Sequence, residues 1–510
     1  MTFARRAPAC QARVALGVLL STLFLWAIIR YGWVAEDAYI TLRTVDNFVH
    51  GFGPRWNVSE RVQAYTHPLW MLLLCLVYGV TREDFLTLVF TCATISVIAF
   101  AIVQRLAGSA TQAISSGLIL ILSPAYVDFS TSGMENALSH LLLVAFAFVY
   151  LQDRESEFAL RRLTFVAALC MTNRLDLGLL LVPALAFETA RAPLGWRTKV
   201  AQIAIGLSPV IAWELFSIVY YGFPFPNTAY AKLNTGVSAR ESLRQGLGYL
   251  ASHRDNDPLT LAAMVAGLVF GISSREYKLR VLAVGVTIYL VYLLRIGGDF
   301  MLGRFLTAPL LMATILIGRC QVLRTRAAIS IPFTAAILAL GVWAPRTPLR
   351  APLQPKPSVD VHGVADERLI YALHSSLAAR HGNAVMPDHY WAESGRALRR
   401  EGSSTVLVKP NVGFLGYFAG PLVHIIDENA LTDPLLARLP IASGEWRIGH
   451  FRRAIPVGYV ETVATGSNKI DDPRVARLYE RLALVTRGPL FRWRRMVAVV
   501  RLHSTQLVAR

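Results

Sequence analysis

Charged residues are scarce in this chain of 510 residues. They make up 16% of it, against about a quarter in soluble globular proteins, whereas hydrophobic residues reach 54%. This balance argues against an ordinary soluble enzyme and indicates that lipid is the main solvent of the protein. A net charge of +18 would suggest nucleic acid as the partner of a soluble protein. Here much of the basic excess lies in short loops between apolar runs, so we expect no nucleic-acid partner.

Cysteine is scarce as well, and internal repeats and low-complexity tracts are absent from the sequence. The five cysteines lie in or beside apolar segments, without paired spacing: Cys10, Cys75, Cys92, Cys170 and Cys320. None lies in the C-terminal third of the chain. The pattern therefore suggests neither a zinc site nor a disulfide framework.

Long apolar runs are abundant. The first, 14–33, is long enough to cross a hydrocarbon core of about 30 Å, and no small-residue cleavage site follows it. We therefore expect a retained first helix with a cytoplasmic N-terminus. Ten further spans are predicted at 85–104, 112–127, 138–151, 162–173, 176–190, 200–221, 258–273, 279–296, 304–319 and 327–344. With these eleven crossings, every cytoplasmic loop carries Arg or Lys, as the positive-inside rule requires.

Two short segments complete the membrane part. Residues 67–80 are apolar but shorter than the ~17 residues that a spanning helix needs, so we expect a helix in the outer interface. Two short spans flank Arg174 and Asp176, as in a helical hairpin that turns within the membrane. Charges there are costly, so this pair either has a function or simply neutralises itself.

The character of the sequence changes after residue 344. A proline-rich linker at 345–360 separates a predicted membrane core, 1–344, from a C-terminal domain, 361–510. Within that domain we expect helices near 366–380 and 390–400 and strands at 405–408 and 422–426, which is an α/β pattern. An odd number of crossings places this domain outside. The basic, aromatic tail 487–510 is expected to rest on anionic lipid headgroups.

Polar residues gather on the outer side of this topology. Five clusters face outward in it: 33–43, 60–68, 130–136, 225–232 and 297–304. A transporter is expected instead to keep ionisable groups near the midplane, within broken helices of an internal repeat. The clusters therefore favour a site at one membrane surface, where a polar acceptor arrives from water and a lipid-borne donor arrives sideways.

An acidic pair, Glu36 and Asp37, directly follows the first span. A carboxylate at the membrane boundary can act as a general base or stabilise a cationic sugar transition state. Because adjacent side chains point in different directions, only one of the two should reach the reacting centre. We predict that Asp37 does so while Glu36 packs or caps. The alternative is that Asp37 is the N-cap of a helix beginning at Ala38.

Outward cations near the interface suggest a phosphate site. Arg43, Lys232 and Arg304 are candidates for binding a lipid-linked phosphate, although a surface cation often only snorkels. His67, before Pro68, is expected either to hydrogen-bond the phosphate or to cap the interfacial helix.

Candidate sugar-binding residues come from the same clusters. Asn227 and Thr228 follow a rigid Phe-Pro turn that can aim an amide at a sugar hydroxyl. The alternative is that Asn227 serves only that turn. Glu135 is a candidate for sugar or cation binding, although acids are also common at helix starts. Asp299 is expected to hold Arg304 in place across a glycine-rich loop.

Taken together, these motifs resemble those of the GT-C arabinofuranosyltransferases. The matching segments are EDA (36–38), ITLR (40–43), GFGPRWN (51–57), ERVQAYT (60–66), FPNTAYAK (225–232), GGDFMLGR (297–304), GYFAG (416–420) and DENALTDPLLAR (427–438). The resemblance covers most of the chain. Its motifs on the membrane face are specific as a set. Relatives often carry two aspartates where this chain has Glu36 and Asp37.

The resemblance implies a polytopic α-helical membrane protein with a GT-C core of about eleven spans, interfacial helices in the first outer loop and a periplasmic C-terminal α/β domain. It implies a polyprenyl-phosphate pentofuranose donor, typically decaprenylphosphoryl-D-arabinofuranose, and a cell-envelope glycan or glycoprotein acceptor. The catalytic acid would be Asp37. Independently of the resemblance, Glu135, Arg174 and Asp176 are candidates for binding the sugar or the acceptor. The bacterial inner membrane is the expected location.

Several alternatives stay open at this level. The enzyme can use another polyprenyl-phosphate sugar, such as mannose or aminoarabinose, and the product can be inverted or retained. The chain can instead be a lipid-carrier flippase or a non-catalytic assembly protein. No cofactor is firmly implied. A divalent cation is possible, although Asp37 and Glu135 alone make a sparse metal site.

Overall fold

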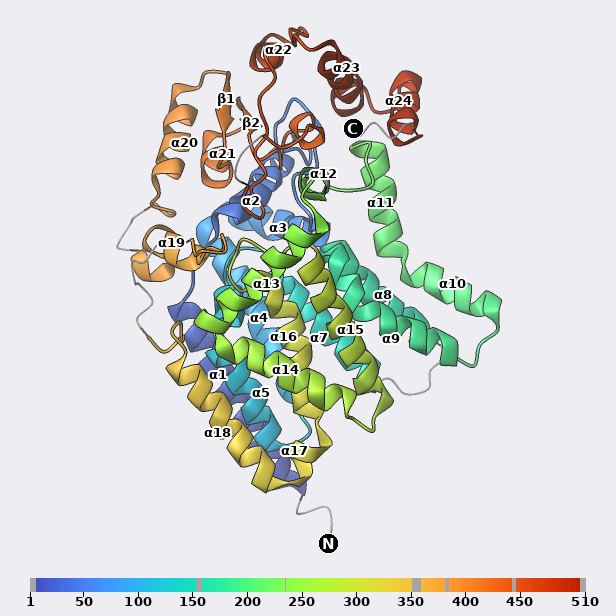
Figure 1. Cartoon of the computed structure of the whole chain (residues 1–510), viewed down its shortest axis with the longest axis vertical. Helices are drawn as coiled ribbons and strands as arrows, with labels where there is room; N and C mark the ends of the chain where they lie inside the picture. The colour runs from blue at the N-terminus through green and yellow to red at the C-terminus, as the bar shows by residue number, and fades with distance from the viewer. Residues whose placement is uncertain are drawn as a thin grey trace. The chain divides into compact units, whose positions relative to one another are not determined.

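The computed structural model describes residues 6–152, 158–233, 235–350, 359–380, 385–442 and 446–504 (Figure 1). The chain forms two compact units, each built from three separate segments. Unit 1 comprises residues 1–34, 88–210 and 239–381, and unit 2 comprises residues 35–87, 211–238 and 382–510.

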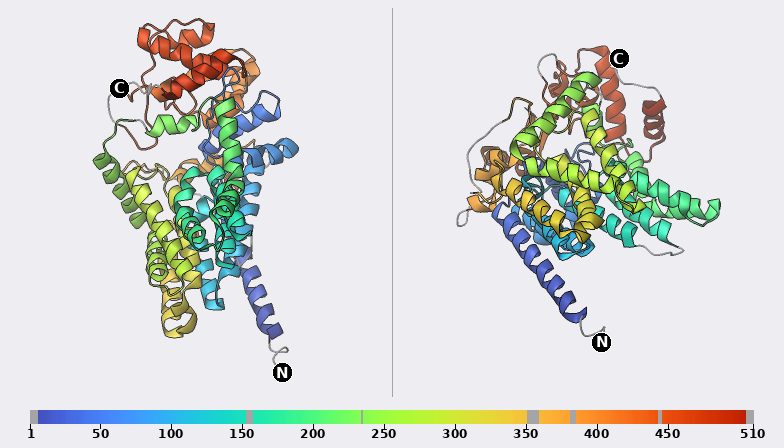
Figure 2. Two further views of the ribbon diagram at one scale, coloured as in Figure 1. Left: turned by 90° about the vertical axis from the view of Figure 1, so that its right-hand side faces the viewer. Right: turned by 60° about the horizontal axis from the view of Figure 1, so that its bottom comes forward.

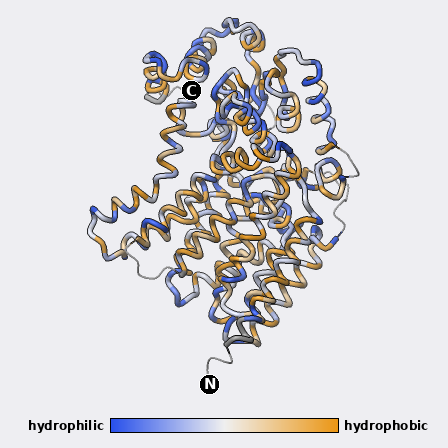
Figure 3. The backbone as a smooth tube through the Cα atoms, turned by 180° about the vertical axis from the view of Figure 1, so that it is seen from behind, coloured by the Kyte–Doolittle hydropathy of each residue, from blue (hydrophilic) through white to orange (hydrophobic). Residues whose placement is uncertain are grey.

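Unit 1 is an all-helical bundle. Its longer helices are α1 (Arg6–Arg30), α4 (Phe85–Leu106), α5 (Ala110–Leu122), α7 (Asn136–Gln152), α8 (Ala159–Asn173), α9 (Gly178–Arg191), α10 (Trp196–Gly206), α13 (Ala239–Asn256), α14 (Pro258–Ile272), α15 (Tyr277–Arg295), α16 (Thr307–Arg319), α18 (Ala327–Trp343) and α19 (Glu367–Ser375). The short α6 (Pro124–Asp128) and α17 (Gln321–Thr325) join them. Figure 2 shows the core helices side by side, and Figure 3 shows hydrophobic residues along their length.

Apolar length separates these helices into two groups. Residues Gln11–Arg30 of α1, together with α4 and α15, are long and apolar enough to cross a membrane, and α10 with α11 (Ser208–Tyr220) makes a fourth if a bent pair counts as one span. Five shorter apolar helices include α5, α7, α14 and α18. The protein is therefore a helical membrane protein, and the number of eleven crossings stays a prediction.

Unit 2 combines helices with a small parallel sheet. Its first part holds α2 (Glu36–Val49), α3 (Pro68–Thr81), most of α11, and α12 (Asn227–Leu233). The C-terminal part holds α20 (Tyr390–Glu401), α21 (Gly413–Ala419), α22 (Tyr459–Thr465), α23 (Pro473–Arg487) and α24 (Trp493–Ser504). Strands β1 (Thr405–Lys409) and β2 (Val423–Asp427) pair in parallel, with Leu407 opposite Ile425. Because α21 connects them, β1, α21 and β2 form one βαβ unit.

Two hydrophobic clusters hold unit 2 together, and each draws on distant parts of the sequence. In one, Ile40 and Trp56 of the first segment pack with Leu415 and Ile425 of the last. In the other, Phe223 and Ala231 of the middle segment pack with residues of the last, among them Tyr459 and Leu482. The segment that follows α1 and the C-terminal region are therefore one packing unit.

The predicted elements largely coincide with observed helices and strands. Each of the eleven apolar runs contains a helix or a helix pair, and the 67–80 run is the 14-residue helix α3. The predicted helices 366–380 and 390–400 contain α19 and α20, and both strands are within one residue of the prediction. The sequence did not predict α13 as a separate helix.

Packing divides the chain in another way than composition does. The described residues 345–350 and 359–380 belong to unit 1, and the described residues from 385 on belong to unit 2 together with 35–87 and 211–238, while the expected domains with boundaries at 344 and 360 stay a prediction. In the predicted linker, residues 351–358 lie outside the described residues. The units are defined by tertiary contacts. A change of composition along the sequence does not indicate which distant segments will be in contact.

Candidate functional site

The first turn of α2 carries the acidic pair. The helix begins at Glu36, and its N-cap is Ala35, which has no side chain for capping. The alternative in which Asp37 caps a helix beginning at Ala38 is therefore wrong. Both acids lie at the positive end of the helix dipole, which favours negative charge there. Successive residues of a helix point about 100° apart, so the two carboxylates occupy different environments.

Glu36 is buried and used by the fold. Its Oε1 accepts hydrogen bonds from the backbone N–H groups of Gly413 at 2.6 Å and Phe414 at 3.1 Å. Burial, followed by the charge of Asp37, raises the pKa of Glu36 to about 8. At neutral pH Glu36 therefore holds its proton in the folded protein. Asp37, beside it, is half-buried.

Arg43 has a structural role in place of the predicted phosphate contact. Its guanidinium donates hydrogen bonds to the backbone carbonyls of Trp56, Gly416 and Val423 at 2.9, 2.7 and 2.7 Å. It also stacks over the Trp56 ring, 4.2 Å from the centroid. The side chain is 2% exposed. The three carbonyls accept hydrogen bonds from most of the N–H groups of the guanidinium. Arg43 therefore connects α2 to the C-terminal region.

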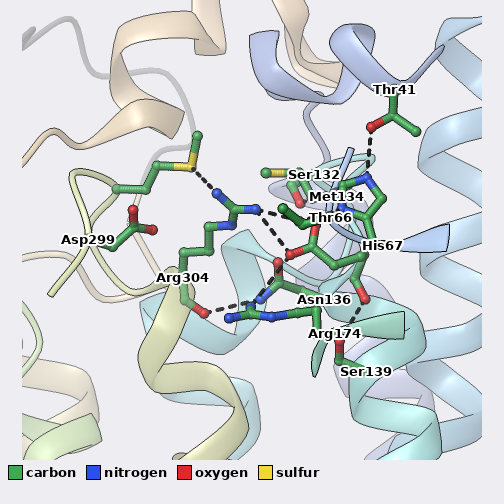
Figure 4. Close-up of polar contacts among 12 residues, drawn as sticks. Thr41, Thr66, His67, Ser132, Met134, Asn136, Ser139, Arg174, Asp299 and Arg304 are labelled. Carbon is green, nitrogen blue, oxygen red and sulfur yellow. Dashed lines mark hydrogen bonds and ion pairs between the residues drawn. The ribbon is translucent and has the colours of Figure 1, made fainter. Parts of the chain in front are cut away.

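His67 lies at the N-cap position of α3, but its ring makes no capping hydrogen bond. Instead, its Nε2 lies 2.7 Å from the Thr41 hydroxyl of α2 (Figure 4). The contact fixes the ring against the helix that carries the acidic pair. The predicted capping role is therefore wrong, whereas the phosphate contact of His67 stays a prediction.

The FPNTAYAK segment forms α12 and the turn before it. The Asn227 amide donates hydrogen bonds to the carbonyls of Ala430, Leu431 and Asp433, at 2.9, 3.2 and 3.0 Å. The amide therefore serves the fold and not a sugar hydroxyl. Thr228 is buried, and within the described ranges its hydroxyl has no hydrogen-bond partner. Lys232 lies in the last turn of α12, where it is half-buried.

A second charged group lies in unit 1, around Glu135. Its Oε1 is 3.0 Å from Nη2 of Arg304 and 3.5 Å from Nη1 of Arg174. Arg174 also forms a bidentate pair with Asp176, at 3.1 and 2.6 Å, and the Tyr289 hydroxyl donates to Asp176. Two guanidinium groups and two carboxylates therefore balance in charge. The predicted Arg174–Asp176 pair forms, and Glu135 joins it to Arg304.

The GGDFMLGR loop presents Arg304 at the start of a short 3-10 helix, Arg304–Leu306. Gly303 adopts a positive φ of 91°, and a Cβ there would lie 2.8 Å from that of Ala125, so only glycine fits. Asp299 accepts a hydrogen bond from the Phe300 N–H at 2.9 Å. The predicted contact of Asp299 with Arg304 stays a prediction. The ion pair of Arg304 with Glu135 is observed.

Sequence reasoning missed the amides that support this charged group. Asn136 donates to the carbonyl of Arg304 and to the hydroxyl of Thr307 (Figure 4). Asn173 donates to the carbonyl of Glu135 at 3.2 Å. Both amides lie within or beside apolar runs, and a polar residue in such a run was the signal that could have found them. Among the described residues, no three or more His, Cys, Asp or Glu side chains are arranged to hold a metal ion.

Comparisons with known proteins agree with these motifs. No protein-family model matches the chain. The terminal β-(1→2)-arabinofuranosyltransferase of Mycobacterium tuberculosis is 27% identical over 536 residues, which cover 86% of this chain and 83% of that protein. The protein of the same name from Corynebacterium glutamicum is 30% identical over 346 residues, which cover 58% of this chain and 49% of that protein.

A solved structure shares the fold. The crystal structure of ArnT from Cupriavidus metallidurans, bound to undecaprenyl phosphate, superposes with a TM-score of 0.52 over 83% of this chain and 87% of that one, at 12% identity. This chain therefore shares the fold of that ArnT structure.

Proposed function

We propose, from the premise that this chain is a GT-C membrane glycosyltransferase similar to the terminal arabinofuranosyltransferases, that it transfers D-arabinofuranose from a polyprenyl phosphate to a cell-envelope acceptor. The acceptor would be a glycan or a glycoprotein on the outer face of a bacterial inner membrane. The observation that carries the proposal is the first turn of α2, where Glu36 is buried in backbone hydrogen bonds and Asp37 remains half-buried beside it.

Asp37 is the proposed catalytic residue. A glycosyl phosphate already has a good leaving group, so strong protonation of the departing oxygen is not required. If the anomeric configuration is inverted, Asp37 takes the proton of the acceptor hydroxyl as that oxygen attacks the anomeric carbon. If it is retained, the carboxylate stabilises the oxocarbenium-like centre. Protonation of Glu36 supports either role, because a neutral neighbour does not repel a negative charge on the Asp37 carboxylate.

Within unit 2, His67 and Lys232 are proposed to contact the donor phosphate. Arg304 of unit 1 is proposed separately as a phosphate ligand. Cations and hydrogen-bond donors bind the phosphate in the ground state and stabilise its charge as the glycosidic bond breaks. Glu135 orients the Arg304 guanidinium through an ion pair of 3.0 Å, and Arg174 with Asp176 supports that pair. Arg43 and Asn227 are not part of this proposal, because backbone carbonyls occupy their donors.

A transfer assay with the purified full-length protein tests the proposal. Labelled decaprenylphosphoryl arabinofuranose is supplied with an arabinan acceptor in detergent or nanodiscs. We expect labelled glycan and free polyprenyl phosphate in equal amounts. Polyprenyl-phosphate mannose serves as the comparison donor, and its preferred use would correct the sugar. Movement of intact donor across vesicles, without free polyprenyl phosphate, would identify a flippase.

A further inference from the structure

Unit 2 contains a groove that none of the proposed catalytic or phosphate-binding residues lines. It lies beside β1, between α20 and the loop that follows the strand, and its volume is about 580 Å³. This volume falls within the range of roughly 300–1,000 Å³ that is typical of ligand sites. The groove is large enough to receive more than one sugar ring.

One wall of the groove is a face of α20. Tyr390, Ser394 and Glu401 line it, and their spacing of four and seven residues places them along one side of a helix. A neighbouring side of α20 packs closely on α21, since a Cβ on Gly395 would lie 2.7 Å from the Leu415 carbonyl oxygen. The helix is therefore fixed by its packed side while the lining side faces the groove.

The other wall follows the carboxyl end of β1. Lys409, Pro410 and Asn411 form it, directly before α21 of the βαβ unit. In α/β units, ligands bind at this end of parallel strands. The wall is rigid, because Asn429 donates to the Pro410 carbonyl at 2.7 Å and the Glu428 N–H donates to that of Lys409 at 3.1 Å.

The lining combines aromatic rings with hydrogen-bond donors and acceptors. Tyr390 is 65% exposed, and its ring lies 5.1 Å from that of Trp391. Lys409, Glu401 and Asn411 supply donors and acceptors. A sugar chain matches this lining, because each ring has an apolar C–H face and a hydroxyl edge. One lysine with one glutamate gives no excess positive charge, which argues against nucleic acid.

The groove is joined by contacts to the turn that carries Asp37. Two residues after Asn411, the Gly413 N–H donates to Glu36. Ring contacts run from Trp391 to His389 at 4.7 Å, from His389 to Phe414 at 5.5 Å, and from Phe414 to Tyr39 of α2 at 5.0 Å. The walls of the groove are therefore connected through packed residues to the first turn of α2.

We propose that this groove binds a segment of the acceptor glycan away from the hydroxyl that receives the sugar. The assignment of that glycan as the acceptor rests on the proposed function, whereas glycan binding in the groove does not. A subsite of this kind favours long acceptors over short ones. It lowers KM for the long acceptor without taking part in bond formation.

A direct binding experiment tests the groove without any transfer step. Full-length protein in nanodiscs is titrated with a long and a short arabinofuranose oligosaccharide, and binding is measured by saturation-transfer NMR. We expect Tyr390→Ala to weaken binding of the long oligosaccharide about tenfold, the loss typical of an aromatic contact. Tyr390→Phe keeps the ring and is expected to bind almost as wild type does.

Trp493→Ala is the matched control, since Trp493 is 77% exposed on α24, outside the groove. Asn411→Ala is the second groove variant and tests the opposite wall. Melting temperatures equal to that of wild type exclude misfolding as the cause of weaker binding. Failure of wild type to bind either oligosaccharide, or unchanged binding by both groove variants, would overturn the inference.

Transfer kinetics separate this inference from the proposed function. We expect Tyr390→Ala to raise KM for the long acceptor about tenfold and to leave kcat, the donor KM and the short-acceptor KM unchanged. Oligosaccharide binding that depends on Tyr390, in a protein that transfers no sugar, would refute the proposed function and support the groove. Transfer by wild type with identical long-acceptor KM in Tyr390→Ala would refute the groove alone.

Discussion

Glu36 and Gly413 are 377 residues apart in the sequence and are joined by a hydrogen bond of 2.6 Å from the Gly413 N–H to the Glu36 carboxylate. The bond fixes the first turn of α2 to the first turn of α21. Of the two neighbouring acids, Glu36 is therefore held by the fold, and the catalytic role of Asp37 stays a prediction.

Glu36 makes the stability of the protein depend on pH. Its pKa is about 8 in the folded protein, against an ordinary value of 4.5, so between these values the folded state holds a proton that the unfolded state has lost. The contribution of Glu36 to the free energy of unfolding is therefore full below about pH 4.5 and decreases towards pH 8. In Glu36→Gln, we expect a smaller fall of melting temperature from about pH 5 to 8. Exposed Glu480→Gln is the control, and a wild-type slope in Glu36→Gln would contradict the assignment.

Asp37→Asn tests the catalytic acid. The change keeps the size of the side chain but removes its charge, so we expect turnover to fall about 10²-fold or more while donor binding persists. A purely structural role predicts a loss of roughly 1 kcal/mol of stability and near-normal transfer. Rates are compared at matched amounts of folded protein, with exposed Asp255→Asn as the control. Equal rates would move the catalytic role to another acid.

Arg43→Lys separates a structural arginine from a phosphate ligand. Lysine cannot reproduce the fork that reaches the three carbonyls, so we expect a lower free energy of unfolding, by roughly 2–3 kcal/mol. The donor KM of the folded fraction should remain that of wild type. Thermal unfolding and donor titration measure the two effects, with exposed Arg400→Lys for comparison. A raised donor KM at unchanged stability would restore the phosphate role.

Arg304→Ala tests the donor phosphate site. Loss of one charge-assisted contact should raise the donor KM and weaken polyprenyl-phosphate binding about tenfold or more, with a smaller effect on kcat. Arg295→Ala removes an exposed charge nearby in the sequence and should change neither. Binding of polyprenyl phosphate to Arg304→Ala with wild-type affinity would exclude Arg304 from the site.

Cysteine labelling tests the topology. In a variant without native cysteines, Ser59→Cys and Ser403→Cys should react with an impermeant maleimide added outside spheroplasts, whereas Ser273→Cys should react only after permeabilisation. All three serines are exposed in the structure, so burial does not prevent reaction. Labelling of Ser273→Cys from outside would contradict the eleven-span topology.

Helices and strands were predicted from the sequence more accurately than the contacts between side chains were. The apolar run at 85–104 became α4, and the predicted strand 405–408 became β1, because hydropathy and β-propensity are properties of neighbouring residues. The same reasoning placed the acidic pair at the end of the first span. Local pattern was sufficient for these features.

Side-chain roles depended on distant partners and were predicted less well. Arg43 was expected at a phosphate, but its partner Gly416 is 373 residues away in the sequence. Asn227 was expected at a sugar, but Ala430 is 203 residues away. Neither periodicity nor spacing in the sequence indicates that a side-chain donor will form a hydrogen bond with a carbonyl from a remote segment. The Arg174–Asp176 pair was predictable because its members are two residues apart.

The three-segment composition of unit 2 also sets an order in time. Ribosomes add about 5–20 residues per second, so tens of seconds separate the synthesis of residues 35–87 from that of residues 382–510. During this interval Glu36 lacks its Gly413 partner and Arg43 lacks the Gly416 and Val423 carbonyls. In a nascent chain from which only the helical bundle has been synthesised, the acidic pair is therefore still in water. The surroundings of the pair are completed only when the C-terminal segment has been made.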